Sequence, residues 1–159
     1  MDWFGRKRNR AVEEDRRRYV AVFGVIAGLL KREAALISSL GKLHFEDENG
    51  INGPALGYLY GFADAAMQIA KLELNNEDGR ALLKSVYDLY AEGRGEFYLA
   101  FIAQGLGHDG VLSAAARDEI LSAMKDGGET YARWDTSHGK NVPWGLGKYL
   151  GMRDAAGSL

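Results

Sequence analysis

Proline is nearly absent from this chain, and its rarity constrains the fold more than any other feature. Only two prolines occur among 159 residues, Pro54 and Pro143. Proline disrupts the interior of an α-helix because it lacks an amide hydrogen and clashes with the preceding turn. In the long proline-free stretches, apolar residues recur every three or four positions, which is the period of an amphipathic helix. The sequence therefore predicts an all-α fold.

Start and stop signals divide the chain into five or six helices. Asn76 is a capping residue type, and Gly53 followed by Pro54 is a typical helix start. Glycines commonly follow the last turn of a helix, and Gly127 with Gly128 is expected to end one. The first four helices are expected at residues 11–40, at residues 53–71, after Asn76 as far as Gly93, and over the stretch "EFYLAFIAQ". The last is expected at residues 113–125.

The length fits one domain. Residues 1–10 are predicted to be a basic arm and residues 11–159 a compact helical domain. From about Glu129 the chain is rich in glycine but retains aromatic residues. We interpret this part as a short helical turn and an irregular C-terminal tail packed on the body.

Composition excludes several classes of function. The formal net charge is −2, so the protein as a whole does not attract nucleic acid or anionic membranes. The chain has no cysteine, which excludes disulfides and thiolate sites and favours a cytoplasmic location. The apolar run 19–30 resembles part of a signal peptide, but charged residues follow it at once without a cleavage site. It is predicted to be a buried core helix.

Two glycine stripes are expected to bring helices close together. Gly57, Gly61, Asp64 and Gln68 share one helix face, and glycine inside a helix costs roughly 0.5–1 kcal/mol relative to alanine. Small residues at this spacing let two helix backbones approach, a principle best established in membranes. The first helix carries a similar stripe, which comprises Arg17, Ala21, Gly24, Gly28 and Lys31.

We predict that the two stripes pack on each other, with Asp64 as their polar contact. Because an unpaired buried carboxylate is costly, Asp64 would need Arg17, Lys31 or a tyrosine hydroxyl as its partner. Two alternatives remain open: the glycines line a ligand groove beside Asp64, or the same contact joins two subunits.

Most catalytic and cofactor motifs are incomplete. The pattern Gly105-x-Gly107-x-x-Gly110 would need a parallel sheet to bind a dinucleotide, and the sequence offers no partner strands. The neighbours Asp135, Ser137 and His138 are typical of a turn. The three histidines are widely separated and follow no metal-binding pattern, so neither a metal nor a cofactor is expected.

The basic arm has a functional and a structural interpretation. Arg6, Lys7, Arg8 and Arg10 could contact nucleic acid or, beside Trp3 and Phe4, an anionic membrane. A solvated arm balanced by the acidic residues that follow is favoured.

We predict a non-enzymatic protein that acts through protein–protein contacts, either by self-association or with a partner protein. The aromatic tail supports this, because Trp144, Leu146, Tyr149 and Leu150 are rich in residue types that anchor interfaces. The alternative is a small-molecule-binding or enzymatic domain with a pocket near Asp64. Its other walls would come from the aromatic helices that carry Tyr87, Tyr90, Tyr98 and Phe101.

Overall fold

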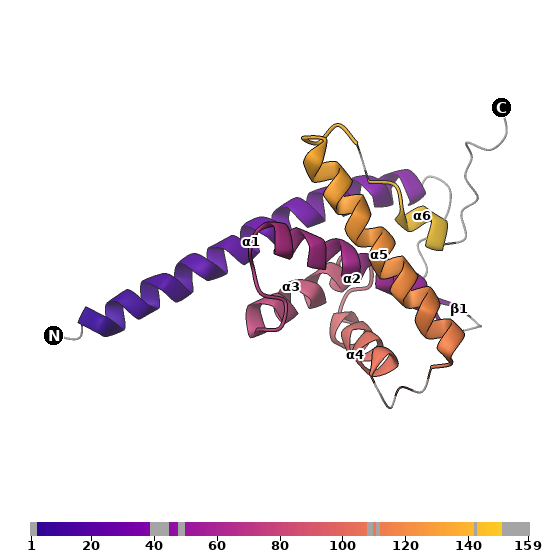
Figure 1. Cartoon of the computed structure of the whole chain (residues 1–159), viewed down its shortest axis with the longest axis horizontal. Helices are drawn as coiled ribbons and strands as arrows, with labels where there is room; N and C mark the ends of the chain where they lie inside the picture. Colours follow the sequence, from indigo (N-terminus) through magenta and orange to yellow (C-terminus); the bar gives the residue numbers. More distant parts are fainter. Residues whose placement is uncertain are drawn as a thin grey trace.

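The computed structural model describes residues 3–38, 45–47, 50–107, 110, 112–141 and 143–150, and in the first helix it describes side chains from Val12 to Ala35. The fold is all-α, as the sequence predicts. Among the described residues there are six helices and one short antiparallel hairpin (Figure 1). The helices are α1 (Trp3–Ser38), α2 (Gly53–Ile69), α3 (Glu77–Asp88), α4 (Gly95–Leu106), α5 (Ala114–Thr136) and α6 (Leu146–Tyr149). The hairpin pairs β1 (Glu46–Asp47) with β2 (Gly50–Ile51).

Helix α2 lies at the centre of the body and contacts each of the other five helices. Its core side chains, among them Tyr58, Leu59 and Phe62, are fully buried. In Figure 1, α5 crosses α2, whereas the N-terminal half of α1 projects away from the other helices. The side chains of residues 12–18 are accordingly exposed.

Side-chain caps fix the starts of three helices. Asn76 Oδ1 accepts a hydrogen bond of 2.7 Å from the Gly79 amide at the start of α3, as predicted. Asn52 Oδ1 accepts one of 3.0 Å from the Ala55 amide, with Pro54 in the first turn of α2. Ser113 caps α5 in the same way.

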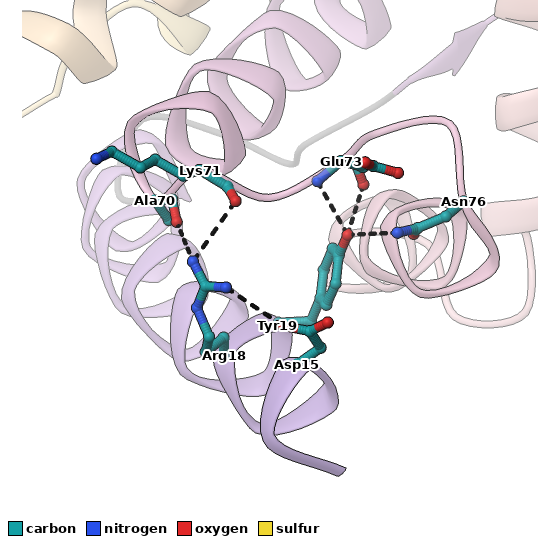
Figure 2. A network of polar contacts seen from close by, with 7 residues as sticks. All are labelled: Asp15, Arg18, Tyr19, Ala70, Lys71, Glu73 and Asn76. Carbon is teal, nitrogen blue, oxygen red and sulfur yellow. Dashed lines mark hydrogen bonds and ion pairs between the residues drawn. The ribbon is translucent and has the colours of Figure 1, made fainter. Parts of the chain in front are cut away.

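Polar groups of α1 hold the loop between α2 and α3 (Figure 2). The Tyr19 hydroxyl donates to the Glu73 carbonyl oxygen at 2.7 Å and accepts from the Glu73 amide at 3.0 Å. It also accepts a hydrogen bond of 2.7 Å from Asn76 Nδ2, so Asn76 belongs to this network and also caps α3. The Arg18 guanidinium donates to the Ala70 carbonyl oxygen at 2.7 Å. The loop thereby fixes α1 against the body.

Two sequence predictions about helix extent and one about burial are wrong. Helix α1 begins at Trp3, so the predicted arm of residues 1–10 is helical from that residue onward. Helix α5 continues through Gly127 and Gly128 to Thr136, because these glycines lie at a helix crossing and do not end the helix. The apolar run 19–30 is only half buried, since α1 lies on the surface of the body. The predicted tail itself packs on the body over residues 143–150.

Candidate functional site

The glycines of α2 pack against α5. A Cβ atom at Gly57 would lie 2.7 Å from the Ile120 carbonyl oxygen, and one at Gly61 would overlap the backbone of Met124. Gly127 of α5 is their counterpart, because a Cβ there would overlap the Tyr58 carbonyl oxygen. Backbone therefore meets backbone on both sides of this crossing.

The two predicted stripes do not meet. A Cβ at Gly24 or at Gly28 would find no heavy atom within 4 Å, so both glycines of α1 face open space. Asp64 accepts its hydrogen bond from Gln68 Nε2 of its own helix, at 2.8 Å, and not from α1. Arg17 instead pairs with Glu13 at 3.5 Å. Helix α5 occupies the position on α2 that the sequence assigned to α1, and Gly127 of α5 lies against the α2 backbone there.

The outer face of α1 is exposed and carries no charge over about two and a half turns. We call it the outer stripe, which comprises Val20, Ala21, Gly24, Val25 and Gly28. Val20 is 65% exposed and Val25 41% exposed. Solvated helix faces in soluble proteins are normally rich in charged side chains. The outer stripe is therefore an apolar surface on the body that the described residues leave uncovered.

The predicted interface residues of the tail mostly dock on their own chain. Leu146 is fully buried, and Leu150 packs against the core. The Tyr149 ring lies 5.7 Å from the Tyr58 ring, and its hydroxyl donates to Asp126 at 2.7 Å. Trp144 alone among the four is 45% exposed. Three of these residues thus contribute to folding, and Trp144 remains nearly half exposed.

A carboxyl group of α1 lies inside the protein beneath this segment. Glu33 is fully buried, and its Oε1 accepts a hydrogen bond of 2.6 Å from the Leu146 amide. Its Oε2 has no hydrogen-bond partner, and neither does the buried hydroxyl of Tyr58. Burial raises the pKa of Glu33 to about 7, although the amides of Leu146 and Gly145 oppose this shift. Burial, and secondarily the charge of Glu33, raises the pKa of Tyr58 well above its usual range.

A cleft of about 460 Å³ opens between α5 and the segment that docks on it. Asp126, Thr130 and Arg133 line one wall, at a spacing that places them on one face of α5. The opposite wall consists of Asn141, Pro143, Trp144, Gly145 and Lys148. Burial alone would raise the pKa of Asp126, but hydrogen bonds from Tyr149 and Lys148 outweigh it and lower the pKa. We call this feature the α5 cleft.

An apolar groove of about 550 Å³ lies near the predicted Asp64 pocket. Tyr60 lines it, and burial and then the charge of Asp64 raise the pKa of this tyrosine. Asp64 itself does not line the groove, and of the predicted aromatic walls Tyr87, Tyr90, Tyr98 and Phe101 none does. The apolar lining comes from Leu74, Leu83, Leu99, Ile102, Ala103, Leu106 and Met124.

The remaining motifs have structural roles or lie outside the described residues. Gly105 and Gly107 stand at the end of α4, where the sequence predicts a helix stop. Asp135, Ser137 and His138 belong to a turn at the end of α5. The His138 amide donates to the Asp135 carbonyl oxygen at 3.0 Å, and the Ser137 hydroxyl donates to the Trp134 carbonyl oxygen at 2.9 Å. His44 and His108 lie outside the described residues, as do the side chains of Arg6, Lys7, Arg8 and Arg10.

In the described part of the chain, no group of three or more His, Cys, Asp or Glu side chains is arranged to hold a metal ion. None of the helices in the described residues has the length and apolar character needed to cross a membrane.

Sequence reasoning missed Glu33, Asp126 and Arg133. Glu33 follows Lys31 and Arg32 and so resembles a solvated charge, yet it stands seven residues after Ile26 on the core face. This seven-residue spacing from Ile26 could have predicted that Glu33 is buried. No sequence pattern could have predicted the α5 cleft, because its second wall depends on where the tail docks.

Comparison with known protein families, with curated proteins and with solved structures finds no significant match to this chain.

Proposed function

We propose that this is a non-enzymatic helical protein that acts by self-association, with the outer stripe of α1 as its interface. The observation that carries the proposal is the uncharged, exposed face formed by Val20, Ala21, Gly24, Val25 and Gly28. Exposed apolar patches of this kind on a folded body commonly mark interaction surfaces.

The glycines of the outer stripe suit another helix as the partner. With no side chain at Gly24 or Gly28, a second backbone can approach α1 as closely as α5 approaches α2. A second copy of α1 offers the same small residues and fits this surface. The projecting N-terminal half of α1 would then extend over the partner molecule (Figure 1).

The order of charges along α1 favours an antiparallel pair. When Val20 of one copy lies opposite Val25 of the other, Glu13 and Glu14 lie opposite Arg32 and Lys31. A parallel pair would instead place these like charges next to each other, which is unfavourable.

Light scattering after size-exclusion chromatography tests the proposal. We expect the wild type to have twice the chain mass of 17.4 kDa, and Val25→Glu to have the mass of one chain. Leu121→Glu is the matched control, because Leu121 is 49% exposed on α5, away from the outer stripe, and this variant should remain a dimer. A wild-type mass of one chain at high concentration would refute self-association.

A second candidate function is the binding of a small apolar molecule in the groove beside Tyr60. The groove's volume and its mostly aliphatic lining favour it. Anilinonaphthalene sulfonate is a suitable fluorescent probe, and Ala103→Trp should fill the groove. Equal probe fluorescence from this variant and the wild type would exclude the groove as the binding site.

A further inference from the structure

The α5 cleft carries an excess of positive charge. Among its lining residues, Asp126 is the one acidic side chain, and Lys148 Nζ lies 3.2 Å from its Oδ2. Arg133 forms no close ion pair with a described residue, although its charge helps to lower the pKa of Asp126. Its guanidinium donates a 3.2 Å hydrogen bond to Thr130 Oγ1. One cation therefore remains available after Asp126 and Lys148 are paired.

The walls of the cleft suit a planar group. Trp144 keeps nearly half of its surface exposed although its neighbours Pro143 and Leu146 are buried. An exposed indole at the edge of a concave site offers a flat surface on which a second ring can stack. The volume of about 460 Å³ is within the range of small-molecule sites.

A buried tyrosine backs one wall of the cleft. The Tyr58 side chain is fully buried, and its hydroxyl has no hydrogen-bond partner. This hydroxyl lies directly behind Gly145, since a Cβ atom there would be 2.6 Å from it. Tyr58 does not itself line the cleft, so it supports the Gly145 wall from behind and is not a contact for a ligand.

We propose that the α5 cleft binds a small aromatic anion, a carboxylate or a phosphate monoester. Arg133 binds the anionic group through charge-assisted hydrogen bonds, and the ring lies on Trp144. Lys148 remains paired with Asp126. Its positive charge attracts the anion electrostatically but does not contact it. This site is independent of the outer stripe of α1, so each proposal can fail without the other.

Isothermal titration calorimetry on the full chain tests the site, with phenyl phosphate and benzoate as probes and inorganic phosphate for comparison. We expect phenyl phosphate to bind at least about tenfold more tightly than inorganic phosphate, because only the former has a ring to stack. Arg133→Met should weaken phenyl phosphate binding by about tenfold or more, the loss expected for one charge-assisted hydrogen bond.

Lys125→Met is the matched control, because Lys125 is exposed on the same helix but does not line the cleft. It should bind phenyl phosphate as the wild type does. Amide chemical-shift changes should be concentrated at residues 130–148. The proposal is overturned if neither aromatic probe binds at millimolar concentration. It is equally overturned if Arg133→Met, with its helical content intact, binds phenyl phosphate as tightly as the wild type.

Discussion

Replacing Glu33 by glutamine should stabilise the protein above neutral pH and leave it nearly unchanged in acid. Glu33 is fully buried with a pKa of about 7, against 4.5 for the exposed group. Between these values the folded protein keeps a proton that the unfolded chain has lost. The stability contributed by the neutral carboxyl is therefore complete below pH 4.5 and is lost as the pH rises toward 7.

The size of the effect follows from the same two values. A difference of 2.5 pKa units, 7 − 4.5, corresponds to about 3 kcal/mol of destabilisation once Glu33 is ionised. Glutamine resembles the neutral acid and still accepts the hydrogen bond from the Leu146 amide. We therefore compare the unfolding free energies of Glu33→Gln and the wild type at each pH. The advantage of the variant should be about 2–3 kcal/mol larger at pH 8 than at pH 5.

Urea denaturation followed by circular dichroism at pH 5 and pH 8 measures this difference in unfolding free energy. In thermal denaturation at pH 8, the melting temperature of Glu33→Gln should exceed that of the wild type by roughly 5–10 °C. Glu119→Gln is the control, because Glu119 is exposed on α5 and its replacement should change neither curve. A constant offset between wild type and Glu33→Gln at both pH values would refute the assignment of Glu33 as a buried ionisable group.

Four further substitutions test the packing. Gly61→Ala should lower the unfolding free energy by about 3 kcal/mol, because the added methyl group meets the Met124 backbone. Gly24→Ala in dilute protein should be neutral or slightly stabilising, because Gly24 faces open space, and urea denaturation compares the two variants. Tyr19→Phe should cost about 1–3 kcal/mol and accelerate hydrogen exchange at residues 71–76, and unchanged exchange would contradict the network of Figure 2. Leu146→Ala should cost about 2–5 kcal/mol in the same denaturation assay; a loss below 1 kcal/mol would contradict tight docking of the tail.

The sequence predicts those parts of the fold that local interactions determine. The cap at Asn76 and the start at Pro54 depend on a few neighbouring residues, and both occur as predicted. Gly127 was misinterpreted because a glycine that ends a helix and a glycine that permits a crossing look alike in sequence. Only the position of the Tyr58 carbonyl oxygen distinguishes the two roles.

The candidate sites depend on long-range packing and were less accessible to prediction. The sequence identified the glycines of α1, but it could not show that α5 takes their expected place on α2 and leaves them exposed. The α5 cleft joins Arg133 to Trp144 only because the segment after α5 turns back onto the body. The Leu146 amide finds its acceptor in Glu33, 113 residues earlier in the chain.

The distance between identical positions in two copies tests self-association through α1 most directly. The chain has no cysteine, so Val12→Cys provides a single attachment site for a spin label, at an exposed position away from the outer stripe. In the antiparallel pair described above, position 12 lies opposite position 33, so the two labels are separated by 21 residues along the helix axis, 33 − 12. Pulsed electron paramagnetic resonance should give roughly 30 Å. Absence of any dipolar coupling between copies at high protein concentration would contradict the account.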